Sequence, residues 1–229
     1  MKIKGISLLA FVFVVLGLTS CFHGYVANYS VGLSTVECPV DVKQQFGETK
    51  VVNVAENGVS DNHYEDDNID IVWRIDNKTI YFYLVNKTSR TIKINWDDIS
   101  YVDTKGQVVG VAPLRPSKPT TTVPHGAKFS DFLLPAEHFY FRPRKYGYGG
   151  VEELYLIPCF YLSLKDYKTE APLLIGKTMK VMMPIMIQNV QNDYTFTFTI
   201  DKLLNVKNET GKYKISAQKR KEKTDSVYQ

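Results

Sequence analysis

The chain has 229 residues, a formal net charge of +4, and 44% hydrophobic and 13% aromatic residues. This length accommodates one large β domain or two small ones. The positive net charge alone does not indicate a nucleic-acid partner, because a nucleic-acid-binding protein concentrates its basic residues on one face. The 15 tyrosines and 12 phenylalanines favour pleated sheets over helices.

The first twenty residues have the pattern of an export signal. Lys2 and Lys4 precede an apolar run of about 13 residues, which is shorter than the roughly 20 that a membrane-spanning helix needs. The run ends in Leu-Thr-Ser-Cys at residues 18–21, which resembles the lipobox of bacterial lipoproteins. In a lipobox the cysteine becomes the acylated first residue of the mature protein, so we expect Cys21 to carry the lipid. The alternatives are an uncleaved N-terminal anchor and an ordinary signal peptide with an incidental cysteine.

The positive charge belongs to the two ends of the chain. Lys2 and Lys4 leave with the signal, and residues 216–229, which we expect to be a disordered basic tail, hold four basic and two acidic residues. Residues 22–215 then contain 22 basic and 22 acidic residues. We therefore predict that the lipid at Cys21, and not electrostatic attraction, holds the protein at a membrane, with no nucleic-acid partner.

The first half of the mature chain predicts short strands separated by turns. Residues 22–50 are expected to begin as a linker, Val51–Val54 to form a short strand and Glu56–Asn68 to form a polar loop. Apolar residues then alternate with the period of half-buried strands. The strands predicted in this region are Ile69–Ile75, Thr79–Val85, Ile92–Trp96, Tyr101–Asp103 and Val108–Val111.

The second half opens with a proline-rich segment, 113–124. Proline has no backbone N–H to donate to a neighbouring strand, so we expect this segment to be an extended crossing loop. Pro184 interrupts one of the later strands, which favours an edge position or a bulge there. We expect residues 202–208 to form a short turn at the end of the fold. After residue 21, no long stretch has apolar residues spaced with the period of a helix. The strands predicted here are Ala127–Leu134, His138–Phe141, Leu154–Leu164, Met179–Ile187 and Tyr194–Ile200.

About eight to ten strands with frequent turn signals predict an all-β fold, an antiparallel two-sheet sandwich that is immunoglobulin-like in the loose sense. A closed barrel is the alternative. The expected division of the chain is a signal peptide (1–20), the lipidated N-terminus with a linker and first loops (21–50), the β-sandwich (51–215) and the basic tail (216–229).

Cys38 and Cys159 remain once Cys21 is assigned to the lipid. An envelope compartment permits a disulfide between them. Cys159 lies in an apolar run, Leu154–Leu164, where a buried thiol fits equally well. Three alternatives stay open: a disulfide, two buried thiols, or a catalytic thiol at Cys159.

No metal or cofactor site is predicted, because no metal-ligand spacing joins the four histidines. These histidines are His23, His63, His125 and His138. Four aspartates in and just after the polar loop 56–68 offer carboxylates that suit calcium. Their spacing matches no recognised calcium-binding loop, so we expect these side chains to be solvated. The carboxylates are those of Asp61, Asp66, Asp67 and Asp70.

The best candidate for a binding site is the glycine- and tyrosine-rich loop 142–150, together with the aromatic residues that precede it. Arginine offers fork-shaped donors to carboxylates and phosphates, and tyrosine offers a flat ring with a polar tip. The alternative is that Phe139 and Phe141 are core anchors and the rest is an ordinary basic loop. The candidate partner-binding residues are Tyr140, Arg142, Arg144, Lys145, Tyr146 and Tyr148.

A resemblance that covers about half of the mature chain rests on five short stretches. They are residues 81–88 (YFYLVNKT), 92–97 (IKINWD), 101–106 with its Gly106, 123–126 (VPHG) and 134–135 (LP). This pattern resembles uncharacterised lipoproteins of Bacteroidetes-type bacteria. The resemblance implies a β-sandwich in the cell envelope and transfers no catalytic residue. In such bacteria an acidic run after the lipidated cysteine looks like a surface-export signal, whereas here residues 22–25 are FHGY, which implies an outer-membrane protein facing the periplasm.

Two functions of different classes remain open. The first is a non-enzymatic binding or accessory module on a lipid anchor, whose partner is an envelope protein or a glycan. The second is an envelope hydrolase acting on glycans or peptides, which would need converging carboxylates in a cleft or Cys159 beside a histidine. The sequence contains no nucleophile motif, so we favour the first.

Overall fold

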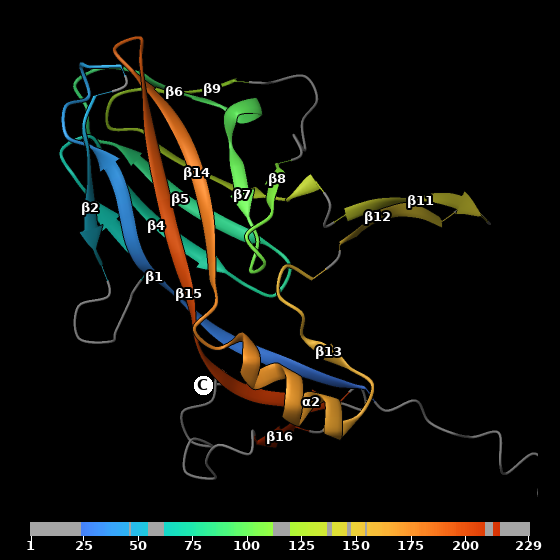
Figure 1. Ribbon diagram of the computed structural model, residues 1–229. Helices are drawn as coiled ribbons and strands as arrows, with labels where there is room; N and C mark the ends of the chain where they lie inside the picture. The colour runs from blue at the N-terminus through green and yellow to red at the C-terminus, as the bar shows by residue number, and fades with distance from the viewer. Residues whose placement is uncertain are drawn as a thin grey trace, which may run out of the picture.

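The computed structural model describes residues 24–45, 47–54, 62–111, 120–136, 139–145, 148–153, 155–208 and 213–215. Their strands form a ten-stranded sheet, here called sheet A, a four-stranded sheet, sheet B, and a separate two-stranded hairpin, with antiparallel pairing throughout. Sheet B lies behind the long strands of sheet A in Figure 1. This arrangement confirms the predicted all-β sandwich.

Sixteen strands occur in the described residues, more than the eight to ten expected, because several have only two or three residues. Sheet A contains β1 (Tyr25–Pro39), β2 (Thr49–Asn53), β6 (Ile92–Asn95), β7 (Ser100–Val102), β8 (Val108–Gly110), β9 (Thr120–Val123), β13 (Phe160–Tyr161), β14 (Thr178–Ile187), β15 (Val190–Asn208) and β16 (Tyr213–Ile215). Sheet B contains β3 (His63–Glu65), β4 (Ile69–Ile75), β5 (Ile80–Asn86) and β10 (Lys128–Leu133). The hairpin consists of β11 (Phe139–Lys145) and β12 (Tyr148–Glu153).

The core lies between the two sheets and follows the alternation in the sequence. Alternate residues of β4, β5 and β15 are buried, as the period of two predicts. Trp73 of sheet B packs against Phe196 and Phe198 of sheet A, with ring centroids 4.8 and 5.5 Å apart. Phe82 completes this cluster at 5.5 Å from Trp73. Aromatic side chains therefore join the two sheets.

The expectation of a linker and first loops over residues 21–50 is wrong for Tyr25–Pro39, because β1 occupies these residues and pairs with β15 along the strand. The register shifts between Ala27 and Tyr29, between Ser30 and Val31, and between Leu33 and Thr35. Each shift interrupts the period of two, which hides this strand in the sequence. Bulges also bend a strand, and β1 and β15 continue beyond the sandwich to a smaller group of elements (Figure 1).

This smaller group, here called the small lobe, consists of β13, helix α2 (Leu164–Glu170) and the 3-10 helix η4 (Ala171–Leu174), packed on the first residues of β1. The sequence predicted a buried strand over residues 154–164 and no helix. That strand is reduced to β13, and α2 begins directly after it, where Ser163 caps the helix by accepting a hydrogen bond from the Asp166 amide at 3.0 Å.

Pro184 lies in an internal strand, so the predicted edge position is wrong. β14 pairs with β15 on one side and with both β7 and β6 on the other. Pairing on that second side ends at Met182 and resumes at Ile185, because the 3-10 helix η2 (Trp96–Asp98) separates β6 from β7. The proline lies opposite this break, where no backbone N–H is needed to pair with a neighbouring strand.

Candidate functional site

Most residues of the predicted binding loop belong to the hairpin β11–β12. Tyr140, Arg142, Arg144 and Lys145 lie on β11 and Tyr148 lies on β12, with Lys145 paired to Tyr148. The expectation of a loop over residues 142–150 is therefore wrong for the described backbone. Tyr146 and the lipidation site Cys21 lie outside the described residues, and the partner-binding role of this segment stays a prediction.

Cys38 and Cys159 are both free and buried, so the structure contains no disulfide between them. The Cys159 carbonyl accepts a hydrogen bond from the Ala27 amide near the start of β1, whereas Cys38 lies near the end of that strand. Eleven residues of strand at about 3.3 Å each separate the two positions by on the order of 30 Å. A disulfide needs Cα atoms within about 7 Å, so the two thiols cannot bond in this fold.

Cys159 lacks the properties of a catalytic nucleophile. It is 1% exposed, and this burial raises the pKa of its thiol to about 12. Burial also raises the pKa of the Cys38 thiol. The thiolate is the reactive form of cysteine, and at pH 8 a thiol with a pKa near 12 is ionised in only about one molecule in ten thousand.

We expect neither thiol to react with a disulfide reagent at pH 8 in the folded Cys21→Ser variant. Both should react fully after denaturation, which releases two equivalents of reporter per chain. A control peptide with a solvent-exposed cysteine gives the reference rate. Rapid reaction at Cys159 in the folded protein would contradict its inert role and restore it as a candidate nucleophile.

The described histidines and acidic residues form structural contacts. His63 Nε2 lies 2.9 Å from Asp70 Oδ1, and His125 Nδ1 contacts the Thr88 carbonyl. No group of three or more potential metal ligands occurs within the described ranges. His23, Asp61 and His138 lie outside them.

Asp66, one of the carboxylates considered for calcium, is held by four donors. Its Oδ1 accepts hydrogen bonds from the amides of Asn68 and Ile69, at 2.7 and 2.8 Å. Its Oδ2 accepts from the hydroxyls of Tyr64 and Tyr194, at 3.2 and 3.0 Å. Burial, with the Asp66 charge as a further cause, raises the tyrosine pKa values above their usual range, so both hydroxyls remain protonated donors. Asp66 therefore ties the turn before β4 to β15.

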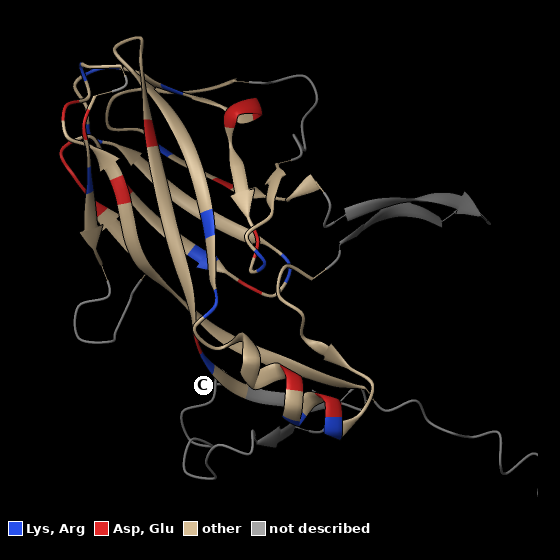
Figure 2. Cartoon of the chain, viewed as in Figure 1, with Lys and Arg blue, Asp and Glu red and all other residues tan. Residues whose placement is uncertain are grey.

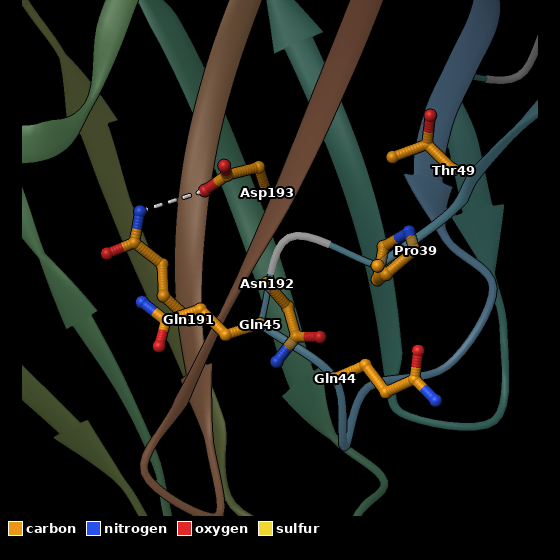
Figure 3. A pocket seen from close by; sticks show the side chains of 8 residues that line it. Pro39, Gln44, Gln45, Thr49, Gln191, Asn192 and Asp193 are labelled. Carbon is orange, nitrogen blue, oxygen red and sulfur yellow. Dashed lines mark hydrogen bonds between the residues drawn. The ribbon is translucent and has the colours of Figure 1, made fainter.

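A small polar cavity lies beside the end of β1 and the start of β15 (Figure 3). Gln191 Nε2 donates to Asp193 Oδ1 at 3.0 Å, and Asn192 Nδ2 donates to the Val190 carbonyl at 2.9 Å. The volume is about 50 Å³, room for only a few water molecules, whereas pockets for drug-sized ligands measure about 300–1,000 Å³. We therefore assign no ligand to it. Its lining residues are Pro39, Gln44, Gln45, Gly47, Thr49, Gln191, Asn192 and Asp193.

The strongest candidate surface is the outer face of sheet B, here called the sheet B face and defined by Val72, Arg74, Tyr81, Tyr83 and Phe132. Tyr83 on β5 lies in register with Val72 on β4 and is 52% exposed. Tyr81, two residues earlier, lies in register with Arg74 on one side and Phe132 on the other. Three neighbouring strands thus place aromatic, aliphatic and guanidinium groups side by side.

Contacts within the sheet B face orient its side chains. The Arg74 guanidinium carbon lies 4.6 Å from the centroid of the Tyr81 ring, within cation–π distance. The Tyr81 and Phe132 rings are 5.8 Å apart. Each group therefore restrains its neighbour, which lowers the entropy lost when a partner binds.

The sheet B face was not predicted from the sequence, although β5 carries a signal for it. An ordinary half-buried strand alternates apolar and polar residues. In β5 the inward Ile80, Phe82 and Leu84 alternate with residues that are also aromatic or aliphatic, Tyr81 and Tyr83 among them. A strand with two apolar faces that covers only one core leaves the other face for a further contact.

Charges of both signs are interspersed over the sandwich in the view of Figure 2. Two pairs border the sheet B face: Lys87 Nζ lies 2.6 Å from Glu65 Oε1, and His63 lies against Asp70. None of the helices in the described part of the chain is both long and apolar enough to span a bilayer.

The fold and this surface define the chain as an antiparallel β-sandwich with an exposed aromatic sheet face. Comparison of the chain with protein-family models, with curated proteins and with solved structures finds no match.

Proposed function

We propose that the chain is a membrane-anchored envelope lipoprotein whose β-sandwich serves as a non-enzymatic binding or accessory module. The lipobox at residues 18–21 supports acylation of Cys21. Two or more acyl chains hold a protein at a bilayer almost permanently, because each buried methylene contributes about 0.8 kcal/mol. The proposed location is the outer membrane of a bacterial envelope, on its periplasmic side.

The exposed aromatic groups of the sheet B face carry the binding part of this proposal. Tyrosine, phenylalanine and arginine are the residue types enriched in the centres of protein interfaces. Here Tyr81, Tyr83 and Arg74 lie together, and charged pairs such as Lys87–Glu65 lie at the border. An apolar, aromatic centre with a charged border is the usual anatomy of a protein interface, so the proposed partner is a protein.

A photoreactive phenylalanine analogue at position 83, in cells that make the protein, tests this proposal. We expect a discrete covalent adduct with one partner protein, because Tyr83 lies at the centre of the proposed interface. The matched control is the same analogue at Val108, which is 72% exposed on β8 of sheet A. No adduct at position 83, or the same adducts from both positions, would overturn the assignment of the sheet B face.

Substitution of Tyr83 by alanine should then weaken the isolated complex at least about tenfold, since truncation of a hot-spot tyrosine costs about 2 kcal/mol or more and about 1.4 kcal/mol corresponds to tenfold. Val108→Ala should leave the affinity unchanged. Both side chains are exposed, so neither substitution should alter folding by more than about 0.5 kcal/mol.

A further inference from the structure

The small lobe is held together by its own buried contacts. The hydroxyls of Tyr29 and Tyr161 lie 3.1 Å apart, and both donate to the Pro158 carbonyl, at 3.2 and 3.1 Å. The Tyr167 ring of α2 packs edge-on against Tyr161, with centroids 5.9 Å apart. These contacts join α2 and β13 to β1, so the residues between them keep a fixed position relative to β1.

Three large apolar side chains are nevertheless left on the surface of this lobe. Leu162, between β13 and α2, is 61% exposed, and Leu173 of η4 is 69% exposed. Phe160 of β13 is about one-third exposed. Leucines are usually buried, and a single exposed one needs no explanation. Here three lie within a segment of fourteen residues of the same lobe.

The path of the chain places this segment beside the proposed lipid anchor. Tyr25, the first residue of β1, pairs with Tyr161, and Val26 pairs with Phe160. Tyr25 follows Cys21 by four residues, which span at most about 14 Å when fully extended. The start of β1 lies next to β13 in Figure 1. Paired strands lie about 5 Å apart, so an acyl group on Cys21 keeps β13 within about 20 Å of the bilayer surface.

We propose that the small lobe is a membrane-contact surface and that Phe160, Leu162 and Leu173 insert into the interfacial layer of the bilayer that holds Cys21. This inference rests on the lipid anchor of the proposed function. Helix α2 carries both basic and acidic residues, Lys165 and Lys168 beside Asp166 and Glu170, so apolar burial and not charge drives the contact. Bilayer headgroup layers are about 5–8 Å thick, a depth that side chains on a tethered lobe reach.

The contact would fix the orientation of the whole module. The end of β1 at Pro39 lies at the opposite end of the strand from Tyr25 and would point away from the membrane. A lobe held against the lipid prevents the tethered sandwich from rotating freely. The lipid would then hold the sandwich and also determine which surfaces face a partner.

Fluorescence quenching by brominated lipid tests this inference. The full acylated chain carries a bimane label at Leu162→Cys or Leu173→Cys, in vesicles of phosphatidylethanolamine and phosphatidylglycerol that contain brominated phosphatidylcholine. The matched control is the label at Val108→Cys on sheet A. Cys38 and Cys159 are buried and stay unlabelled in the folded protein. We expect several-fold stronger quenching at positions 162 and 173 than at 108.

Flotation of the same samples separates the two proposals. Equal quenching at all three positions, in a chain that floats with the vesicles, would overturn the membrane-contact surface and leave the lipid anchor intact. A chain that does not float would overturn the anchor itself and this inference with it.

Discussion

Substitution of Phe196 by alanine is expected to lower the free energy of unfolding by about 3–5 kcal/mol, the range for buried phenylalanine in a packed core. Phe196 is fully buried and lies 4.8 Å from Trp73 and 6.0 Å from Tyr64, ring to ring. Both of these neighbours belong to sheet B, whereas Phe196 belongs to sheet A. Its removal therefore opens a cavity between the two sheets.

Denaturant unfolding followed by tryptophan fluorescence measures this loss. Trp73 and Trp96 are the only tryptophans in the sequence, and Trp73 borders the new cavity. Val51→Ala is the control, because Val51 is exposed on the short strand β2 and should change stability by less than about 0.5 kcal/mol. A Phe196→Ala loss no larger than that of the control would show that the two sheets do not share this core.

Asn86 is the second position at which we expect a large loss of stability, about 3 kcal/mol on substitution by alanine. Its side chain is fully buried and makes four hydrogen bonds. Nδ2 donates to the carbonyls of Arg90 and Val123 at 2.7 and 2.9 Å, and Oδ1 accepts from the Thr88 amide and hydroxyl at 2.9 and 2.7 Å. Alanine would leave these groups without their partner.

Two comparisons distinguish this hydrogen-bond network from simple packing. Asn86→Asp keeps the shape but directs a carboxylate at two carbonyls, so it should destabilise at least as much as alanine. Asn95→Ala removes a side chain whose hydrogen bond within the described residues goes to the exposed Asp98 carboxylate, and it should cost less than about 1 kcal/mol. An Asn86→Asp variant with the denaturation midpoint of the wild type would contradict the role of Asn86.

Asn86 also explains part of the pattern that suggested a lipoprotein family. The stretch 81–88 contains an Asn-x-Thr sequence, and the structure gives these two residues a role in joining the sheets. Asn86 ends β5 of sheet B, and its bond to the Val123 carbonyl reaches β9 of sheet A. A folding requirement thus accounts for the Asn-x-Thr part of this stretch.

Strands with an undisturbed period of two could be predicted from the sequence, and those with bulges could not. The alternations over 69–75 and 194–200 correspond to β4 and the central part of β15. Strand β1 escaped detection because three register shifts break its alternation. Helix α2 has seven residues, too few to show a helical period, and its only local signal is the cap at Ser163.

The candidate site was less predictable than the fold. Arginines and tyrosines near residue 144 drew attention because they are close in sequence, whereas the sheet B face assembles Arg74, Tyr83 and Phe132 from three strands. Register between strands determines which side chains are neighbours, and register depends on tertiary pairing. The cysteines illustrate the same point, since only the position of Cys159 beside Ala27 excludes a bond to Cys38.

The intact mass of the protein purified from membranes is the most direct test of the central claim, that the module is held by a lipid on Cys21. We predict a chain that begins at Cys21 and carries the added mass of acyl chains such as palmitate. Cys21→Ser should abolish this mass and release the protein from membranes. A mature chain that retains residues 1–20, or one with an unmodified thiol at Cys21, would contradict the account.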